Sequence, residues 1–177
     1  MSFFQTFKQR DVLLVTLTAA GIIMIINGTR QTMGLFISPL NTSTGLGIVS
    51  ISLAMAVGQF VWGAAQPLAG MIADRHGARP VLLGGLCLTI VGTALIPLMD
   101  STWGLIFTIG LLSAVGNGAC SFSILIGTVA KRIPAEARGN AAGLINAGSS
   151  MGQFVFAPIT TRLIQSLGWM NAMWSLV

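Results

Sequence analysis

The sequence predicts an all-α integral membrane protein, and its composition, its apolar runs and the placement of its basic residues support that fold class. Of its 177 residues, 54% are hydrophobic and only 7% are charged, whereas a typical soluble domain has about 25% charged residues. So few charged side chains cannot form a water-facing surface, and the chain therefore requires an apolar solvent, the lipid bilayer. The 22 glycines suit close contact between membrane helices.

The apolar runs divide the chain into helices, because about 20 helical residues cross ~30 Å of hydrocarbon. Five runs are complete and a sixth begins near the end of the sequence. Pro39 and the polar stretch 41–45 are expected to end the first helix. We expect one transmembrane domain over residues 1–177, with helices at about 12–37, 48–73, 80–99, 103–130, 139–167 and, incomplete, 169–177.

Basic residues fall in alternate connections between these helices. They precede the first run or follow the second and the fourth: Lys8, Arg10, Arg75, Arg79, Lys131, Arg132 and Arg138. The opposite connections contain Asp100 and neither lysine nor arginine. By the positive-inside rule, the N-terminus is cytoplasmic, and we expect a multi-pass protein of the plasma (inner) membrane. The net charge of +5 then reflects topology, and no nucleic-acid partner is expected.

A short motif occurs twice. GQFVW spans residues 58–62 and GQFVF spans residues 152–156, a separation of 94 residues and of three expected helices. An odd number of crossings makes the two copies run in opposite directions. This is the pattern of an inverted-topology repeat, which in transporters brings binding sites near the membrane midplane.

The connection after the second helix reads GMIADRHGARP over residues 70–80. It resembles the signature loop of the major facilitator superfamily at Gly70, Asp74, Arg75, Gly77 and Arg79, which we expect to act as a conformational-switch loop. Ala78 departs from the pattern, since many members have a basic residue there. The resemblance implies the N-terminal six-helix half of that fold, a 3+3 inverted repeat, with the sixth helix truncated and the C-terminal half as a missing partner.

The start of the fifth helix narrows the resemblance. Its small residues and leading arginine are similar to those of the monocarboxylate-transporter-like branch at Arg138, Ala141, Gly143, Ala147, Gly148 and Gly152. Among them, we expect Gly143, Gly148 and Gly152 to serve helix packing. The acidic-glycine pair of the eukaryotic carriers in the first helix is replaced by Asn27-Gly28, so the substrate is left open.

Polar side chains form one stripe on each of four expected helices. Since polar groups that face lipid are unsatisfied, the stripes should converge on a cavity. The superfamily resemblance implies the same, because its first, second, fourth and fifth helices line the central cavity. The predicted substrate-binding residues are Asn27, Arg30, Gln31, Gln59, Asn117, Ser121, Asn146 and Gln153.

Arg30 is the strong charge of this stripe, and no acidic residue lies within the expected helical cores. Its guanidinium matches a carboxylate in bidentate geometry, so we expect it to bind the carboxylate of a small organic anion. Two alternatives remain: the side chain could extend to the outer headgroups, about 10 Å away at 1.5 Å per residue, or an acid of the missing half could pair with it.

The leading hypothesis is a secondary transporter of a small organic anion, working by alternating access, with proton coupling left open. Drug or apolar-solute efflux is a second hypothesis. Drug–proton antiporters of the superfamily usually have an arginine in the fourth helix and a Gly-Pro pair in the fifth, and this sequence has neither in 103–130 and 139–167. A membrane scaffold or inactive fragment is the third, and the 177 residues alone are expected not to transport. No enzyme, metal or cofactor is expected, because the sequence contains no catalytic triad, metal-ligand spacing or phosphate-binding loop.

Overall fold

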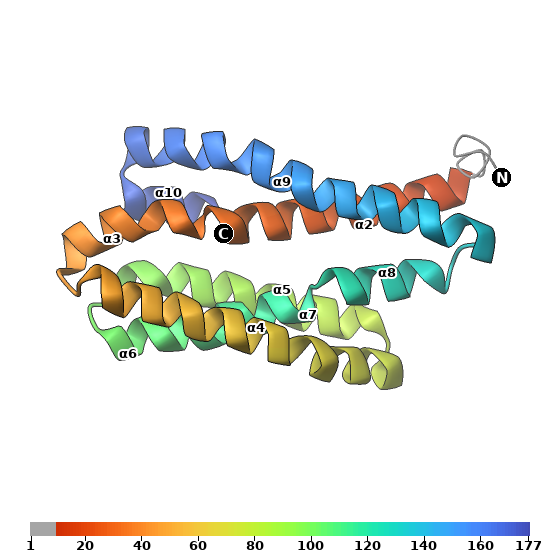
Figure 1. Cartoon of the computed structure of the whole chain (residues 1–177), viewed down its shortest axis with the longest axis horizontal. Helices are drawn as coiled ribbons and strands as arrows, with labels where there is room; N and C mark the ends of the chain where they lie inside the picture. Colours follow the sequence, from red (N-terminus) through yellow and green to blue (C-terminus); the bar gives the residue numbers. More distant parts are fainter. Residues whose placement is uncertain (1–9) are drawn as a thin grey trace.

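The computed structural model describes residues 10–177, which are helical and contain no β-strand. Helical rods connected by short turns run antiparallel to one another (Figure 1). In chain order, the elements are α2 (Arg10–Gln31), the 3₁₀ segment η1 (Thr32–Phe36), α3 (Ile37–Thr44), α4 (Ile48–His76), α5 (Ala78–Leu95), η2 (Ile96–Leu98), α6 (Thr102–Leu105), the π-helical η3 (Ile106–Ser113), α7 (Ala114–Ala119), α8 (Phe122–Ala130), η4 (Ala135–Ala137), α9 (Arg138–Leu167) and α10 (Trp169–Ser175).

Four helical segments are both long enough and apolar enough to cross a membrane: 12–44, 48–76, 78–98 and 102–130. The 30 residues of α9 also exceed the length that a bilayer requires. Pro67 and Pro158 lie inside α4 and α9. Proline within a helix is tolerated in membranes, where neighbouring helices and hydroxyl side chains satisfy the freed backbone groups.

The basic connections lie at one end of the bundle. The α4–α5 turn, the α8–α9 connection and the start of α2 lie together at the right of Figure 1, and α3, α6 and the start of α10 lie at the opposite end. The turn carries Arg75 and Arg79, and the α8–α9 connection carries Lys131 and Arg132. Arg10 and Arg138 are the first residues of α2 and α9, and Lys8 lies outside the described residues.

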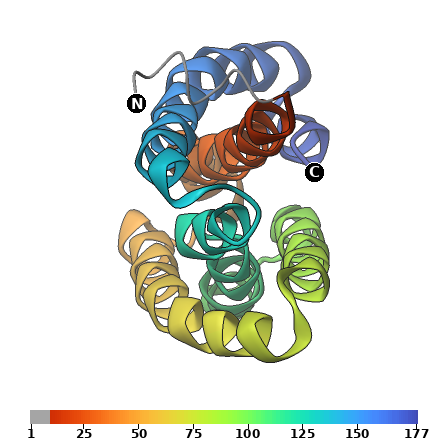
Figure 2. The same ribbon diagram turned by 90° about the vertical axis from the view of Figure 1, so that its right-hand side faces the viewer.

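Viewed along the rods, the helices form two groups. α2, α9 and α10 make one group, and α4, α5, α6 and α7 make the other, with α8 between them (Figure 2). The most extensive contact joins α2 to α9, and α4 packs closely on η3 and α7. Segments distant in sequence are therefore neighbours.

The first helical rod is longer than the predicted 12–37. Pro39 does not end it, because it lies in the first turn of α3, where a backbone N–H needs no helical acceptor. The polar residues that follow remain helical, and their hydroxyls find acceptors within the helix: Thr42 donates to the Ser38 carbonyl at 3.0 Å and Thr44 to that of Leu40 at 2.7 Å. Gly45 ends the rod in a left-handed conformation with φ of 66°.

The fourth rod is interrupted, where an unbroken 103–130 was expected. A π-helical stretch occupies Ile106–Ser113, and the chain becomes extended at Ser121, with ψ of 161°. Close packing accompanies the interruption. A Cβ at Gly118 would lie 3.0 Å from the Trp62 carbonyl oxygen of α4, and a Cβ at Gly85 of α5 would lie 2.8 Å from that of Gly116. π-Helical turns recur near functional sites.

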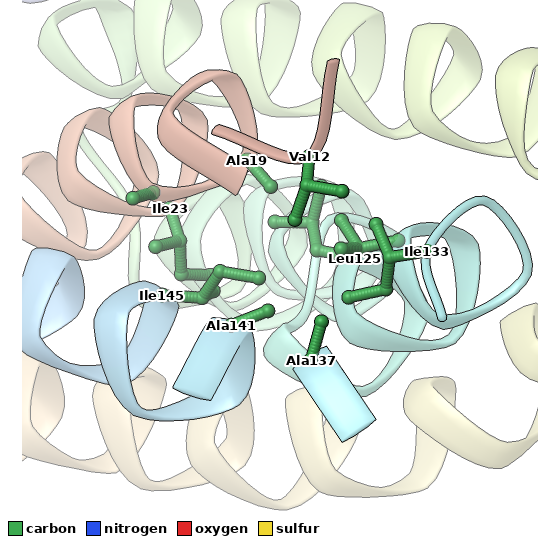
Figure 3. Close-up of a cluster of buried hydrophobic side chains, with 10 residues drawn as sticks. Val12, Ala19, Ile23, Leu125, Ile133, Ala137, Ala141 and Ile145 are labelled. Carbon is green, nitrogen blue, oxygen red and sulfur yellow. The ribbon is translucent and has the colours of Figure 1, made fainter. Parts of the chain in front are cut away.

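Two apolar cores stabilise the bundle at its two ends. At the basic end, α2, α8, α9 and the η4 turn bury one cluster, drawn in Figure 3: Val12, Ala19, Ala20, Ile23, Leu125, Val129, Ile133, Ala137, Ala141 and Ile145. At the other end, α10 joins the cluster of Phe36, Leu40, Ile51, Ala54, Ile96, Leu105, Ala172 and Met173. Their conspicuous alanines allow the helices to approach closely.

The two motif glycines occupy matching helix crossings. A Cβ at Gly152 of α9 would clash with the Met24 carbonyl oxygen of α2, and a Cβ at Gly58 of α4 would lie 3.2 Å from the Ile109 carbonyl oxygen of η3. Both glycines are buried. Gly148 continues the first crossing, because its Cβ would lie 2.7 Å from the Ala20 carbonyl oxygen.

Candidate functional site

A cavity of about 260 Å³ opens among the first, second, third and fourth helical rods and the end of the chain. It is mostly apolar and has a limited number of polar side chains. Its lining comprises Ile25, Ile26, Thr29, Arg30, Gln31, Met33, Phe36, Met55, Gly58, Gln59, Leu86, Thr89, Ile90, Thr93, Ile109, Ser113, Ala114, Asn117, Met173, Leu176 and Val177. An apolar concavity with a small number of convergent polar groups is the usual form of a small-molecule site.

Arg30 is the cation of this cavity. It lies next to the end of α2, is partly buried, and donates from Nη2 to the Oε1 of Gln59 on α4. Its Cζ also lies 4.1 Å from the ring centroid of Trp62. Gln59 and Trp62 are three residues apart on one helix and therefore lie on one face of it. The guanidinium is thus directed against α4 by a neutral acceptor and an aromatic face.

No carboxylate pairs with Arg30 among residues 12–177, the part of the chain whose side chains the structure describes. The one salt bridge within that range joins Lys131 and Asp74 at 3.1 Å, at the basic end of the bundle. A cation–π contact contributes roughly 0.5–2 kcal/mol, depending on how far the pair is desolvated. Neither that contact nor the glutamine neutralises the charge, so the cavity is electropositive and suits an anion.

The fourth rod supplies buried polar atoms without partners. Ser113, Asn117 and Ser121 are spaced four residues apart, and each is buried. Asn117 donates from Nδ2 to the Ser113 carbonyl at 2.7 Å, but the Ser113 Oγ, the Asn117 Oδ1 and the Ser121 Oγ have no protein partner. An unsatisfied buried polar group costs about 1–3 kcal/mol. Because Ser113 and Asn117 line the cavity, a ligand or water there can satisfy them.

The predicted stripes converge only in part. Arg30, Gln31, Gln59 and Asn117 line the cavity, whereas Asn27, Ser121, Asn146 and Gln153 are not among its lining residues. Asn27 donates from Nδ2 to the Ser149 Oγ at 2.7 Å and so joins α2 to α9. Asn146 and Gln153 are exposed on α9. Because α9 crosses α2 closely, Asn146 and Gln153 lie outside the cavity. Their contact with the substrate stays a prediction.

Residues that the stripes did not indicate also contribute: Trp62 contacts Arg30 without lining the cavity, and two threonines line it. Trp62 follows Gln59 by three residues and precedes Gln66 by four, so the same helical spacing would have placed it on the polar face. Thr89 and Thr93 of α5 line the cavity at i, i+4 spacing, although Thr89 donates to the Gly85 carbonyl at 3.0 Å. The third helix was not expected to contribute.

The predicted helix-packing glycines divide in the structure. Gly148 and Gly152 meet α2, but a Cβ at Gly143 would have no heavy atom of another element within 4 Å among the described residues. Gly143 thus has no packing partner among the described residues, and its packing role stays a prediction. The helical period gives the reason, since residues four apart share a face and Gly143, five before Gly148, lies about 140° away from it.

The α4–α5 turn has the charged surface and the sharp geometry that its sequence predicts. Gly77 ends α4 with φ of 88°, a conformation that favours glycine. Asp74 accepts the salt bridge from Lys131, and Arg75 and Arg79 are exposed. Gly70 has open space at its Cβ position among the described residues, so no helix of residues 10–177 approaches it. The role of this turn as a conformational switch remains a prediction.

Comparison with known families identifies the fold. The model of the Major Facilitator Superfamily matches residues 15–177. The chain belongs to the major facilitator superfamily. It is accordingly a multi-pass membrane protein of a family of transporters, and its helical bundle agrees with the predicted N-terminal half of that fold. The superfamily resemblance read from the 70–80 loop is confirmed.

The similar proteins include both carriers and efflux proteins. The chain is 31% identical to the Fujikurins efflux protein of Gibberella fujikuroi over 103 residues. This alignment covers 58% of this chain and 22% of that protein. It is 32% identical over 122 residues to Monocarboxylate transporter 11 of Mus musculus, covering 69% and 26% of the two proteins. It is 28% identical over 130 residues to Multidrug resistance protein Stp of Mycobacterium tuberculosis, covering 73% and 22%. The chain thus spans about a quarter of the length of these relatives.

Proposed function

We propose that the protein carries a small organic anion, a carboxylate in the simplest case, across the membrane by alternating access. The single observation that supports this proposal is Arg30, a partly buried cation that lines the cavity without a carboxylate partner among the described residues. Its partners there are a neutral amide oxygen and an aromatic ring. A carboxylate is a stronger acceptor for guanidinium than an amide and can bind it in bidentate geometry.

In this mechanism, the substrate carboxylate replaces the Gln59 oxygen at the Arg30 guanidinium. Trp62 remains behind the guanidinium and limits its rotamers, so less conformational entropy is lost on binding. Asn117 and Ser113 bind the remaining polar group of the substrate. A second six-helix half, outside this chain, rocks against this one around the site and exposes it to either side in turn.

The remaining assignments follow from the same proposal. The protein moves its substrate without changing it chemically, so it is a carrier and not an enzyme. The positive-inside rule supports a cytoplasmic basic end with the α4–α5 turn inside. The membrane proposed for the protein is the plasma (inner) membrane. The signature turn then contacts the other half during switching, and the lack of any contact at Gly70 within the described residues is compatible with that role.

Uptake by the full-length protein in proteoliposomes tests the proposal. Labelled mono- and dicarboxylates are offered to the parent protein, to Arg30→Gln and to Arg30→Lys. We expect the parent to take up at least one carboxylate. Arg30→Gln should raise KM by at least about 10-fold, because a charged hydrogen bond contributes about 1.5–3 kcal/mol. Arg30→Lys should recover part of the loss, because lysine keeps the charge but not the bidentate geometry of the guanidinium.

The matched control is Arg162→Gln, which removes an exposed arginine from α9 and should leave KM unchanged. Saturable carboxylate uptake with equal KM in the parent and Arg30→Gln would overturn the role of Arg30. Absence of uptake for every carboxylate would overturn the substrate class.

Efflux of an apolar or bulky product is the second candidate, and the similarity to two efflux proteins favours it. The mostly apolar lining of the cavity also suits such a solute. In the same proteoliposomes, hydrophobic dyes are offered without any carboxylate. Dye binding that persists in Arg30→Gln would support efflux over anion transport.

A further inference from the structure

A second hollow lies outside the candidate site, between α4, α5 and α7. It has a volume of about 750 Å³ and, except for His76 at one end, only apolar or small residues line it. Along α4, the lining runs from Val61 to His76, about 22 Å at 1.5 Å per residue. That length exceeds half of the ~30 Å hydrocarbon core, so the groove can accommodate an acyl chain of one leaflet.

The polar end of this groove is basic. His76 and Pro80 belong to its lining, and Arg75 and Arg79 are exposed on the same turn. Asp74, the acidic residue of the turn, is paired with Lys131 of the α8–α9 connection at 3.1 Å. The two arginines have no carboxylate partner among the described residues. They are therefore available to a phosphate in the conformation in which the turn does not contact the other half.

We propose that this groove is a binding site for an anionic phospholipid, with one acyl chain between α4 and α5 and the phosphate at the basic turn. The apolar lining of the groove suits an acyl chain, and its length suits the extension of that chain through one leaflet. The basic residues at its end suit the anionic headgroup. The same end of the bundle is the one proposed to be cytoplasmic, where anionic lipids concentrate and attract basic residues at the membrane surface.

Two glycines provide a matched pair for the test. Gly84 lines the groove and has no heavy atom within 4 Å of its Cβ position, so leucine there fills the groove without displacing another helix. Gly63 of α4 has equally open space but is not part of the lining. Leucine at either position brings the same change in helix propensity.

Native mass spectrometry of the full-length protein measures the retained lipid, after incubation with phosphatidylglycerol or phosphatidylcholine of identical acyl chains. We expect the parent to retain phosphatidylglycerol about five-fold more strongly, as one basic residue at a membrane surface can provide. Gly84→Leu should lose this retention and Gly63→Leu should keep it. Arg79→Gln should equalise the two lipids, whereas Arg162→Gln, at the opposite end of the bundle, should not.

Equal retention of the two lipids by the parent would overturn the proposal, as would identical retention by Gly84→Leu and Gly63→Leu. A Gly84→Leu variant that melts at a lower temperature while its lipid retention is unchanged would show that protein covers the groove, and would also overturn it. The result is independent of the transported substrate, because none of these residues lines the cavity that contains Arg30.

Discussion

The two copies of the repeated motif, Gly58–Trp62 and Gly152–Phe156, perform the same packing task but differ in what surrounds them. Each glycine is buried where another backbone crosses. The glutamine and aromatic of the first copy contact Arg30, whereas Gln153 is exposed and Phe156 lies against Gly28, with its Cδ2 2.5 Å from the position of a Cβ there. The glycines thus maintain the helix crossings in both copies, whereas the other positions of the motif contribute to the candidate site in one copy only.

The largest effect is expected at the tighter crossing. Gly152→Ala introduces a methyl group into the Met24 carbonyl oxygen, and the backbone must move to accept it. Overpacking of this kind costs typically 1–3 kcal/mol, and we expect about 3 kcal/mol because the obstacle is backbone. Thermal unfolding of the detergent-solubilised protein measures the loss, and Gly143→Ala, with open space, is the control. An unchanged melting temperature for Gly152→Ala would refute the packing role.

A functional difference between the copies is expected at their last residue. Trp62→Leu removes the aromatic face behind Arg30, which is worth about 1–2 kcal/mol when desolvated. It should therefore raise the KM for the transported anion by about 10-fold. Trp62→Phe should recover most of the loss, and Phe156→Leu should leave KM near the parent value. Transport kinetics in proteoliposomes give the comparison, and equal effects of the two leucine variants would remove the functional distinction between the copies.

The smallest effect is expected at the looser crossing. In Gly58→Ala the new methyl group lies 3.2 Å from the Ile109 carbonyl oxygen, within the π-helical stretch, and a shift of a few tenths of an ångström accommodates it. We expect a destabilisation of about 1 kcal/mol, at the low end of overpacking costs, in the same unfolding measurement. If Gly58→Ala destabilises as much as Gly152→Ala, the two crossings are equally tight.

The rods and the turn could be predicted because their signals are local. Apolar runs mark where helices lie, and the charged segment 70–80 marks the connection between the second and third of them. The predicted end at 73 is three residues short, because α4 continues to His76 before Gly77 turns at φ of 88°. The interruption at Ser121 could not be predicted, since it lies among small and apolar residues whose hydropathy is the same for a continuous or a broken helix. Likewise, nothing local indicated that the helix would continue after Pro39 with its hydroxyls bonded to carbonyls within it.

The candidate site was predictable at Arg30, Gln59 and Asn117 but not on α9. In water, polarity indicates which face of a helix is exposed. In a bilayer, the face of a helix that packs against its neighbour is the one with small residues. Gly148 and Gly152 therefore determine which face of α9 contacts α2. Asn27 was then used for a bond to Ser149, and the exposed Asn146 and Gln153 lie away from the cavity.

The backbone-to-backbone contact of α2 and α9 has a mechanical consequence. Where Gly148 and Gly152 meet Ala20 and Met24, no flexible side chain separates the two helices. Because the contact is between backbones, no change of side-chain rotamer can absorb a displacement of one helix relative to the other. We therefore expect the two helices to move together, so that a displacement of α9 near Gly148 and Gly152 reaches the end of α2, where Arg30 lies.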